Sequence, residues 1–355
     1  MELRTALELL IDKRDLGFEA CRTLLHDLIE NPEPTQLAAL LVLLRAKGES
    51  AEEIAGLAQA MLELGVRVET PHDVLDIVGT GGDGIGSVNI STGATVIAAA
   101  AGARVAKHGN RSVSSLCGSA DVLEALGVRV DLGAPGVAAC VDRAGVGFMF
   151  APRFHPAMRA VVPVRRALRV RTVFNVLGPL LNPARAAYGL VGVYSPAVSG
   201  VVAEALARLG VRRALVVHSM GLDELTPLGP ASVVEVAAGA PRKQYELEPR
   251  RLGIPRATID DLRGGDAALN AAILLDVFAG ARGAVADALN LNAGVAIYAA
   301  GHVDSPEEGV ALAQEVQRAG RAADVLQAWR RVSHEEGALE DAQGAAVEDA
   351  QTAAS

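Results

Sequence analysis

Residues 76–119 constrain the fold of this 355-residue chain more than any other stretch. Ile77 and Val78 form a short apolar run that stops at the glycine-rich segment 79–84. This pattern is typical of a buried parallel strand followed by a tight loop. An alanine-rich segment and a second apolar run, which ends near Arg104, come next. We therefore expect a strand–loop–helix–strand unit, the building block of a parallel sheet.

Two features of this unit predict an anion site. Glycines allow backbone N–H groups to turn toward a ligand with no Cβ in the way. We expect a helix over 94–101, capped by Ser91 or Thr92, whose positive N-terminal end faces the same loop. Lys107 is one of four lysines in the chain and follows the second strand in a basic loop. Together these groups favour phosphate.

Other interpretations of the glycine segment remain open. The spacing Gly79-x-Gly81-x-x-Gly84 also satisfies the dinucleotide-binding fingerprint, which alone is a weak signal, and it could equally be a simple turn. The fingerprint expects an acidic residue about 20 positions later, to hold a ribose hydroxyl. Arg104 and Lys107 stand there instead. Cations beside an anion site favour a ligand with several phosphates over a nicotinamide dinucleotide.

Composition narrows the class of protein. The formal charge of −9 argues against general nucleic-acid binding. Cys21, Cys117 and Cys140 have no metal-binding spacing, and an odd number of cysteines favours a reducing compartment. We find no signal-peptide pattern and no apolar run long enough to span a bilayer, so we expect a cytoplasmic protein without a membrane segment.

The pattern along the chain predicts an α/β protein with two domains and a tail. Residues 1–72 show helical periodicity, including a helix that Ser50 and Glu53 begin with a capping box. We expect this small helical domain to be joined by part of 160–182. Residues 73–335 alternate strands and helices, which predicts a mainly parallel sheet flanked by helices. Residues 336–355 are acidic and polar, and we expect them to be disordered. Strands are predicted at 146–150, 191–194 and 214–218, and helices at 158–168, 198–209, 267–281 and 284–299.

Asp223 and Glu224 follow one of these strands, at the edge where parallel sheets bind ligands. Adjacent acids in a loop are often only a solvated turn. Beside a polyphosphate site they are also suitable hard-oxygen ligands for Mg²⁺.

Several motifs in order resemble the anthranilate phosphoribosyltransferase family over nearly the whole chain. They are Gly79-Thr80-Gly81-Gly82-Asp83, Asn89-Ile90-Ser91-Thr92, Lys107-His108-Gly109-Asn110-Arg111, Asn175-Val176-Leu177-Gly178-Pro179 and Leu222-Asp223-Glu224. The resemblance implies a nucleoside-phosphorylase-like fold and a homodimer formed through the helical domains. It also implies transfer of the phosphoribosyl group of 5-phosphoribosyl 1-pyrophosphate to anthranilate, with Mg²⁺ as cofactor, in tryptophan biosynthesis.

The resemblance also assigns roles to residues. It implies catalytic roles for Lys107, Asp223 and Glu224, and a Mg²⁺ site at Ser91, Asp223 and Glu224. Anthranilate contacts are implied for Gly79, Asn110 and Arg165, and a lining role for His108 and His155. For the phosphoribosyl pyrophosphate it implies Gly79, Thr80, Gly81, Gly82, Asp83, Ser87, Asn89, Ile90, Ser91, Thr92, Lys107, His108, Gly109, Asn110, Arg111, Ser112, Val113, Ser114, Ser115 and Ser119.

The chain departs from the family pattern at a few positions. Arg169 stands where the family usually has glycine, at the end of the predicted helix that carries Arg165. Leu181 replaces a small polar residue, and Leu116 and Cys117 replace a polar pair. Two rival functions stay open: a pyrimidine nucleoside phosphorylase with the same fold, and a non-catalytic relative that binds nucleic acid or a ligand.

Overall fold

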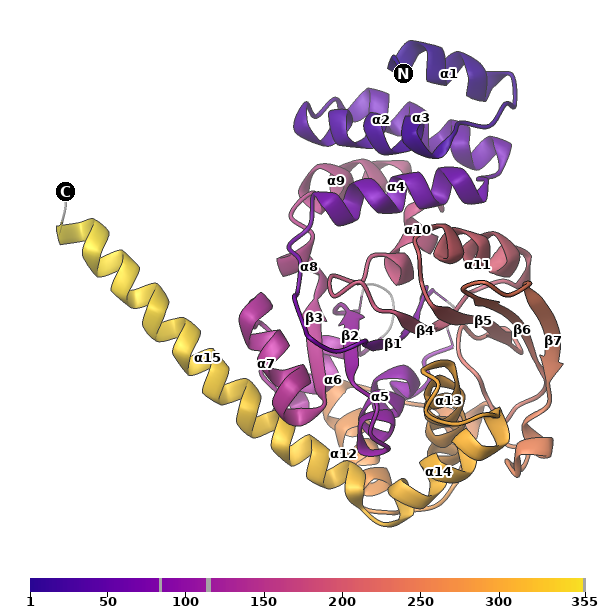
Figure 1. Ribbon diagram of the computed structural model, residues 1–355, viewed down its shortest axis with the longest axis vertical. Coiled ribbons are helices and arrows are strands. Elements are labelled where there is room, and N and C mark those ends of the chain that lie inside the picture. The colour runs from indigo at the N-terminus through magenta and orange to yellow at the C-terminus, as the bar shows by residue number, and fades with distance from the viewer. Residues whose placement is uncertain (83–84, 113–115, 354–355) are drawn as a thin grey trace.

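The N-terminal region is a layer of helices above the rest of the molecule (Figure 1). A computed structural model describes residues 1–82, 85–112 and 116–353, with side chains described up to 346. The first helices are α1 (Leu3–Ile11), α2 (Phe18–Glu30), α3 (Pro34–Lys47) and α4 (Ala51–Glu63). The predicted capping box of α4 is confirmed: the Ser50 side chain accepts from the Glu53 backbone N–H, and the Glu53 side chain accepts from Ser50 N–H.

A seven-stranded sheet forms the centre of the larger domain, in the order β3-β2-β1-β4-β5-β6-β7. The strands from β1 to β5 pair in parallel, and the last two pair antiparallel. The strands are β1 (Leu75–Gly79), β2 (Val105–Gly109), β3 (Val146–Phe150), β4 (Tyr188–Gly192), β5 (Arg213–Ser219), β6 (Ala231–Ala237) and β7 (Lys243–Leu247). The predicted fold class is therefore confirmed.

The strand order reverses at β1. The chain continues from β1 to β2 and β3 on one side of the sheet, and from β4 to β5 on the other. Loops at the carboxyl ends of strands beside such a reversal diverge and leave a crevice, where α/β proteins bind ligands. The predicted glycine loop begins at this crevice. The basic loop was predicted to start at Lys107, but Lys107, His108 and Gly109 are the last residues of β2, where they pair with β3.

Helices cover both faces of the sheet (Figure 1). One core cluster joins a face of the sheet to α5, α7 and α12 to α15. The other face packs on α4, α9, α10 and α11, in a cluster that continues into the N-terminal helices. The helices are α5 (Ile90–Ala100), α6 (Ser119–Ala125), α7 (Ala134–Ala144), α8 (Ala151–Phe154), α9 (Met158–Leu168), α10 (Phe174–Leu177), α11 (Ser199–Arg208), α12 (Ala267–Phe278), α13 (Ala284–Ala299), α14 (Pro306–Arg318) and α15 (Arg321–Ala353), with short 3₁₀ turns at Gly178–Leu180, Pro196–Val198, Pro249–Leu252 and Asp260–Leu262.

Other local predictions were also wrong. The helix after the glycine loop begins at Ile90 rather than 94, and neither Ser91 nor Thr92 caps it, because both lie inside its first turn. β4 begins at Tyr188, three residues before the predicted strand, because its ladder with β1 starts there. β6 and β7 were not predicted at all.

The C-terminal region also differs from the prediction of a disordered tail from 336. α15 continues to Ala353. Glu340 forms an ion pair with Arg153 at 3.1 Å, and the Arg129 guanidinium donates to both Asp341 oxygens, at 2.7 and 2.8 Å. Because the partners lie about 190 to 210 residues away in the sequence, the tail composition gave no sign of them.

No helix in the described parts of the chain is both long and apolar enough to cross a membrane.

Candidate active site

The loop after β5 reaches across the crevice to the glycine loop. The Asp223 carboxylate accepts a hydrogen bond from Gly81 N–H at 2.5 Å, and Glu224 accepts one from Ser91 N–H at 3.2 Å. Ser91 is in the first turn of α5, so Glu224 lies at the positive end of that helix. The structure therefore brings the two predicted carboxylates and the predicted hydroxyl ligand together from positions more than 130 residues apart.

Two glycines make this approach possible. A Cβ on Gly79 would lie 2.3 Å from an Asp223 carboxylate oxygen. A Cβ on Gly192, at the end of β4, would lie 1.5 Å from the Asp223 carbonyl oxygen. Glycine at 79, the last residue of β1, is thus required by packing. Gly192 is a site requirement that sequence reasoning missed.

The Lys107 side chain lies beside Ser91, next to the two carboxylates, and is almost fully buried, with 1% exposed. Its Nζ donates to Ile77 O at 2.5 Å and to Ser91 Oγ at 3.4 Å. Burial lowers the Lys107 pKa, while the negative charges of Asp76, Glu224 and Asp223 raise it. Lys107 is therefore not a solvated surface lysine.

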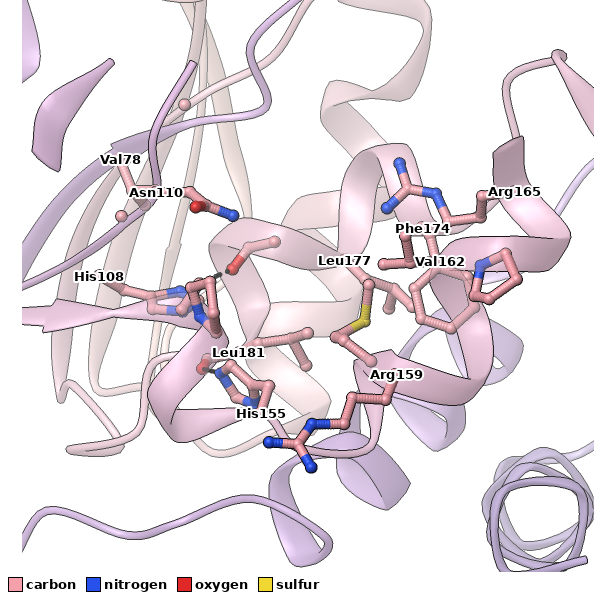
Figure 2. A pocket seen from close by; sticks show the side chains of 17 residues that line it. Val78, His108, Asn110, His155, Arg159, Val162, Arg165, Phe174, Leu177 and Leu181 are labelled. Carbon is pink, nitrogen blue, oxygen red and sulfur yellow. Dashed lines mark hydrogen bonds between the residues drawn. The ribbon is translucent and has the colours of Figure 1, made fainter. Parts of the chain in front are cut away.

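A cavity of about 620 Å³ opens next to the glycine loop, between the sheet edge and helices α8 to α10. Figure 2 shows Asn110 and His108 toward one end and Arg165 and Phe174 toward the other. All five residues predicted to contact anthranilate line this one cavity: Gly79, His108, Asn110, His155 and Arg165.

Two neutral histidines form part of the wall. Their rings make an edge-to-face contact with centroids 5.0 Å apart. His108 Nδ1 hydrogen-bonds Gly178 O at 3.2 Å, and His155 Nε2 hydrogen-bonds Leu181 O at 2.9 Å. Burial, with the nearby His155, lowers the His108 pKa to about 3, and burial also lowers the His155 pKa. Both rings therefore present neutral surfaces to the cavity near pH 7 and are poor proton acceptors.

Arg165 brings a positive charge to a largely apolar part of the cavity. Its guanidinium carbon lies 5.7 Å from the centre of the Phe174 ring, and burial lowers its pKa from a high starting value. α9 ends as predicted at Leu168. Arg169 then takes a left-handed backbone conformation, φ 52°, at the helix C-cap. This geometry explains why glycine suits the position, and Arg169 adopts it without displacing Arg165 from the cavity.

The residues predicted to hold the phosphoribosyl pyrophosphate surround the same crevice. Thr80 Oγ1 accepts from Tyr194 N–H at 3.0 Å, and Thr92 Oγ1 donates to Ser119 Oγ at 3.1 Å. Asn89 Nδ2 donates to Cys117 O at 3.2 Å, which ties the two loops together. Ser87 forms an isolated bridge with Arg263. Asp83, Val113, Ser114 and Ser115 lie outside the described residues.

Arg111 forms ion pairs with two acidic side chains of α6. Its guanidinium donates to both Glu124 oxygens at 2.6 Å and to Asp121 at 2.9 Å. Asp121 also accepts from the backbone N–H groups of Ser112 and Gly118. In this arrangement Arg111 braces the base of the basic loop.

Sequence reasoning missed most of the cavity's apolar lining, including Met158, Val162, Phe174 and Leu177, and also the cation Arg159. The helical periodicity of 158–168 identified a helix but not which of its faces would be covered. Arg171 was also missed. It donates to Gly82 O at 3.0 Å and stacks 4.1 Å above the Tyr194 ring.

The chemistry of the carboxylate site fits a hard divalent cation. Two carboxylates and a hydroxyl are ligands of the kind Mg²⁺ takes when phosphate oxygens and waters complete its shell. Among the described residues, no group of three or more histidine, cysteine or acidic side chains is placed to hold a metal. At a site of two carboxylates and one hydroxyl, oxygens of a phosphorylated substrate would complete the shell of the ion.

Comparison with known proteins gives consistent results. Residues 71–323 match the glycosyl transferase family a/b domain, and residues 4–65 match the helical bundle domain of the same family. An anthranilate phosphoribosyltransferase of Rubrobacter xylanophilus is 52% identical over 305 residues, which cover 85% of this chain and 88% of the relative. The chain belongs to the anthranilate phosphoribosyltransferase family.

Solved structures of the family agree with this assignment. The Thermus thermophilus member has a TM-score of 0.88 at 46% identity, over 93% of this chain and 99% of that one. The Saccharomyces cerevisiae member was solved in complex with PRPP and Mg, and in complex with 4-fluoroanthranilate. Each of these two structures has a TM-score of 0.84 at 27% identity, and each match covers 94% of this chain and 98% of the yeast chain. The family, enzyme class and reaction that the sequence motifs implied are thereby confirmed.

Proposed function

We propose that this site transfers the phosphoribosyl group of 5-phosphoribosyl 1-pyrophosphate to the amine of anthranilate, in L-tryptophan biosynthesis. The products are N-(5-phosphoribosyl)anthranilate and pyrophosphate. The bond from ribose C1 to a pyrophosphate oxygen breaks, the bond from C1 to the amine nitrogen forms, and the amine loses one proton.

The observation that carries this proposal is the position of Gly79. It lines the 620 Å³ cavity and also lies against Asp223, at the edge of the glycine loop. A donor held by the glycine loop and an acceptor in the cavity would therefore meet at this residue. Proximity and orientation of two reactants can supply much of the rate of such a transfer.

The acceptor end requires positioning more than proton transfer. Anthranilate carries an aniline-type amine, which is unprotonated near neutral pH and can attack directly. Arg165, at the far end of the cavity from Asn110 in Figure 2, suits the carboxylate. The Asn110 side-chain oxygen accepts from Arg111 N–H at 2.7 Å, which fixes the amide beside the cavity. The neutral rings of His108 and His155 provide an uncharged wall beside which an aromatic ring can lie.

The donor end requires stabilisation of negative charge. The lost bond leaves charge on pyrophosphate, and groups fixed in place before reaction are the strongest means of stabilising it. Lys107 is buried beside Ser91, and the N-terminus of α5 points into the same region. Mg²⁺ held by Asp223, Glu224 and Ser91 would neutralise phosphate charge there.

The test follows anthranilate fluorescence. We expect the signal to fall only when both 5-phosphoribosyl 1-pyrophosphate and Mg²⁺ are present, and to stay constant with a chelator. The rival phosphorylase activity is tested by incubating the protein with uridine or thymidine and phosphate, where we expect no free base. Base release without anthranilate consumption would contradict the proposal.

The homodimer is part of the same proposal. Ile11 on α1 and Val42 on α3 are 62% and 41% exposed, on two helices of the N-terminal layer. Apolar side chains at the outer surface of this layer suit an interface between two copies of the chain. The proposal also includes a cytoplasmic location and the absence of a nucleic-acid partner.

A further inference from the structure

The ladder of the sheet opens between β1 and β2. β1 pairs with β4 over five residues, from Leu75↔Tyr188 to Gly79↔Gly192. β2 pairs with β3 over five residues as well. β1 and β2 share only the pair Leu75↔Val105. The two strands therefore separate after their first residue, at the side of the sheet where the crevice lies.

This separation breaks the hydrogen bonds that a regular parallel ladder would continue. Extending the register by two residues would place Ile77 opposite Lys107. The backbone groups of Ala106 and His108 that flank Lys107 would then bond to Ile77. Buried backbone groups need partners. Other groups must therefore act as partners for this part of the ladder.

Buried side chains replace it. Asp76, 3% exposed, accepts from His108 N–H at 3.2 Å. Asn182 donates through Nδ2 to Asp76 Oδ2 at 2.7 Å and to Ala106 O at 2.9 Å. Lys107 Nζ bonds Ile77 O. Asp76 and Asn182 thus form a bridge between the separated strands, which we call the Asp76–Asn182 bridge.

The orientation of Asn182 is fixed by a further bond. Its Oδ1 accepts from Ala184 N–H at 2.9 Å, so Nδ2 must face Asp76 and Ala106. Asn182 is 6% exposed and belongs to the segment between the Gly178–Leu180 turn and β4. The bridge therefore joins β1, β2 and the segment that carries the carbonyl partners of the two cavity histidines, Gly178 and Leu181.

Both parts of the proposed site depend on the strand that the bridge holds. Successive side chains of β2 point to opposite faces. Lys107 reaches Ser91 on the side of α5, and His108 lines the cavity. A shift of the end of β2 would move both. We propose that Asp76 and Asn182 are positioning residues of the transfer reaction, which hold β1 and β2 apart and set Lys107 and His108 in register with the two substrates.

Charge adds to this geometry. The Asp76 carboxylate is the largest influence that raises the Lys107 pKa against the effect of burial. Burial in turn raises the Asp76 pKa to about 6, and Lys107 lowers it. The bridge therefore supplies a negative charge beside the buried ammonium as well as the hydrogen bonds.

The experiment compares two bridge variants with matched controls, and it rests on the proposed function, which the wild-type assay tests separately. N182A removes the amide and keeps the Asp76 charge, and N290A removes another buried asparagine, on α13, away from the site. D76N keeps the shape but leaves one acceptor oxygen for two donors. D287N is the control for D76N, because it replaces a half-buried carboxylate of α13 by an amide of the same shape.

We expect N182A and D76N to lower kcat/KM for both substrates by roughly 10- to 100-fold at 25 °C, because small misplacements of reacting groups have effects of this size. The kcat/KM values of N290A and D287N should stay within about threefold of the wild-type value. This should hold even if these controls lower the unfolding midpoint as much as the bridge variants do, because a loss of stability alone does not move the reacting groups. If N182A does not fold, the isosteric D76N decides. Wild-type kcat/KM in a folded bridge variant, or an equal loss in the controls, would overturn the proposal. An inactive wild type would instead overturn the proposed function.

Discussion

Arg169 has a backbone conformation that costs an arginine stability. Its φ of 52° is in the left-handed region at the C-cap of α9, where glycine is favoured. We predict that R169G raises the free energy of unfolding by about 1 kcal/mol, the left-handed penalty less the entropy that glycine gains in the unfolded chain. Urea unfolding measures this.

The control for that substitution is R166G, in the last turn of the same helix. Arg166 is exposed and has a helical backbone, so glycine there should lower stability by up to about 1 kcal/mol. If R169G raises the free energy of unfolding and R166G lowers it, the backbone conformation of Arg169 is the cause, because both variants replace arginine by glycine. A loss of stability in both variants would contradict it.

His108 makes stability depend on pH. Its folded pKa is about 3, below the ordinary value near 6.5. Below pH 6.5 the unfolded chain takes up a proton that folded His108 refuses, so this stability is present above pH 6.5 and is lost as pH falls toward 3. Asp76 acts in the opposite direction, because its folded pKa is raised to about 6.

Comparing variants isolates the histidine contribution. Between pH 7.5 and pH 5, wild type should lose about 2 kcal/mol more unfolding free energy than H108Q, from the difference between the two pKa values. H302Q, at an exposed histidine, should follow wild type. Urea unfolding at the two pH values measures all three proteins. Parallel pH dependence in wild type and H108Q would show that His108 titrates normally.

At the scale of elements, α15 fastens two parts of the larger domain. Glu340 accepts from Gly133 N–H, the N-cap position of α7, through both carboxylate oxygens at 2.9 Å. It also pairs with Arg153 of α8, the helix whose first residues line the cavity. A carboxylate at a helix N-terminus stabilises that end. The acidic C-terminal helix therefore has a structural role that its composition concealed.

We predict that E340A lowers the free energy of unfolding by about 1 kcal/mol, the usual effect of losing a helix-capping group. D276A, which removes an exposed acid of α12, should change it by less than about 0.5 kcal/mol. Thermal or urea unfolding would compare the two. Equal stability of E340A and wild type would mean that the capping contact contributes nothing in solution.

Elements whose own sequence pattern determines them could be predicted, and elements that depend on partners distant in the sequence could not. The strand 146–150 and the helices 158–168 and 284–299 are found where predicted, because an apolar run or helical period with clear ends marks each of them. β7, Lys243–Leu247, is mostly exposed and polar, so its sequence lacks the apolar pattern of a buried strand. Its position depends on pairing with β6. The start of α5 and the helical structure of the last part of α15 likewise depend on distant partners.

At the scale of the whole molecule, the helical layer and the sheet share one core. The cluster that contains α2 to α4 continues through α9 and α10 to β4, β5 and β6. The cavity lies where this shared core meets the carboxyl edge of the sheet. The family resemblance predicted which residues would meet there, such as Asn110 and Arg165. They could not predict the apolar wall, the Gly192 contact or the Asp76–Asn182 bridge, because these follow from packing between separate segments.

The outer surface of the helical layer carries the prediction about assembly. We expect wild type to be a dimer, and V42E and I11E to shift it toward monomer, because a charge at an apolar interface is costly to bury. V66E makes the same change at an exposed valine outside the helices and should stay dimeric. Size-exclusion chromatography with light scattering reads out all four proteins. Dimeric V42E and I11E would place the interface elsewhere.

The central claim is that the carboxylates after β5 complete a phosphoribosyl-transfer site at the glycine loop. The most direct measurement is the rate of anthranilate consumption by the double variant D223N/E224Q across a range of Mg²⁺ concentrations. E307Q/E308Q, an adjacent exposed pair on α14, serves as the control. We predict that D223N/E224Q loses at least about 100-fold in turnover and its normal response to Mg²⁺, while the control behaves as wild type. A wild-type rate and Mg²⁺ response in D223N/E224Q would contradict the account.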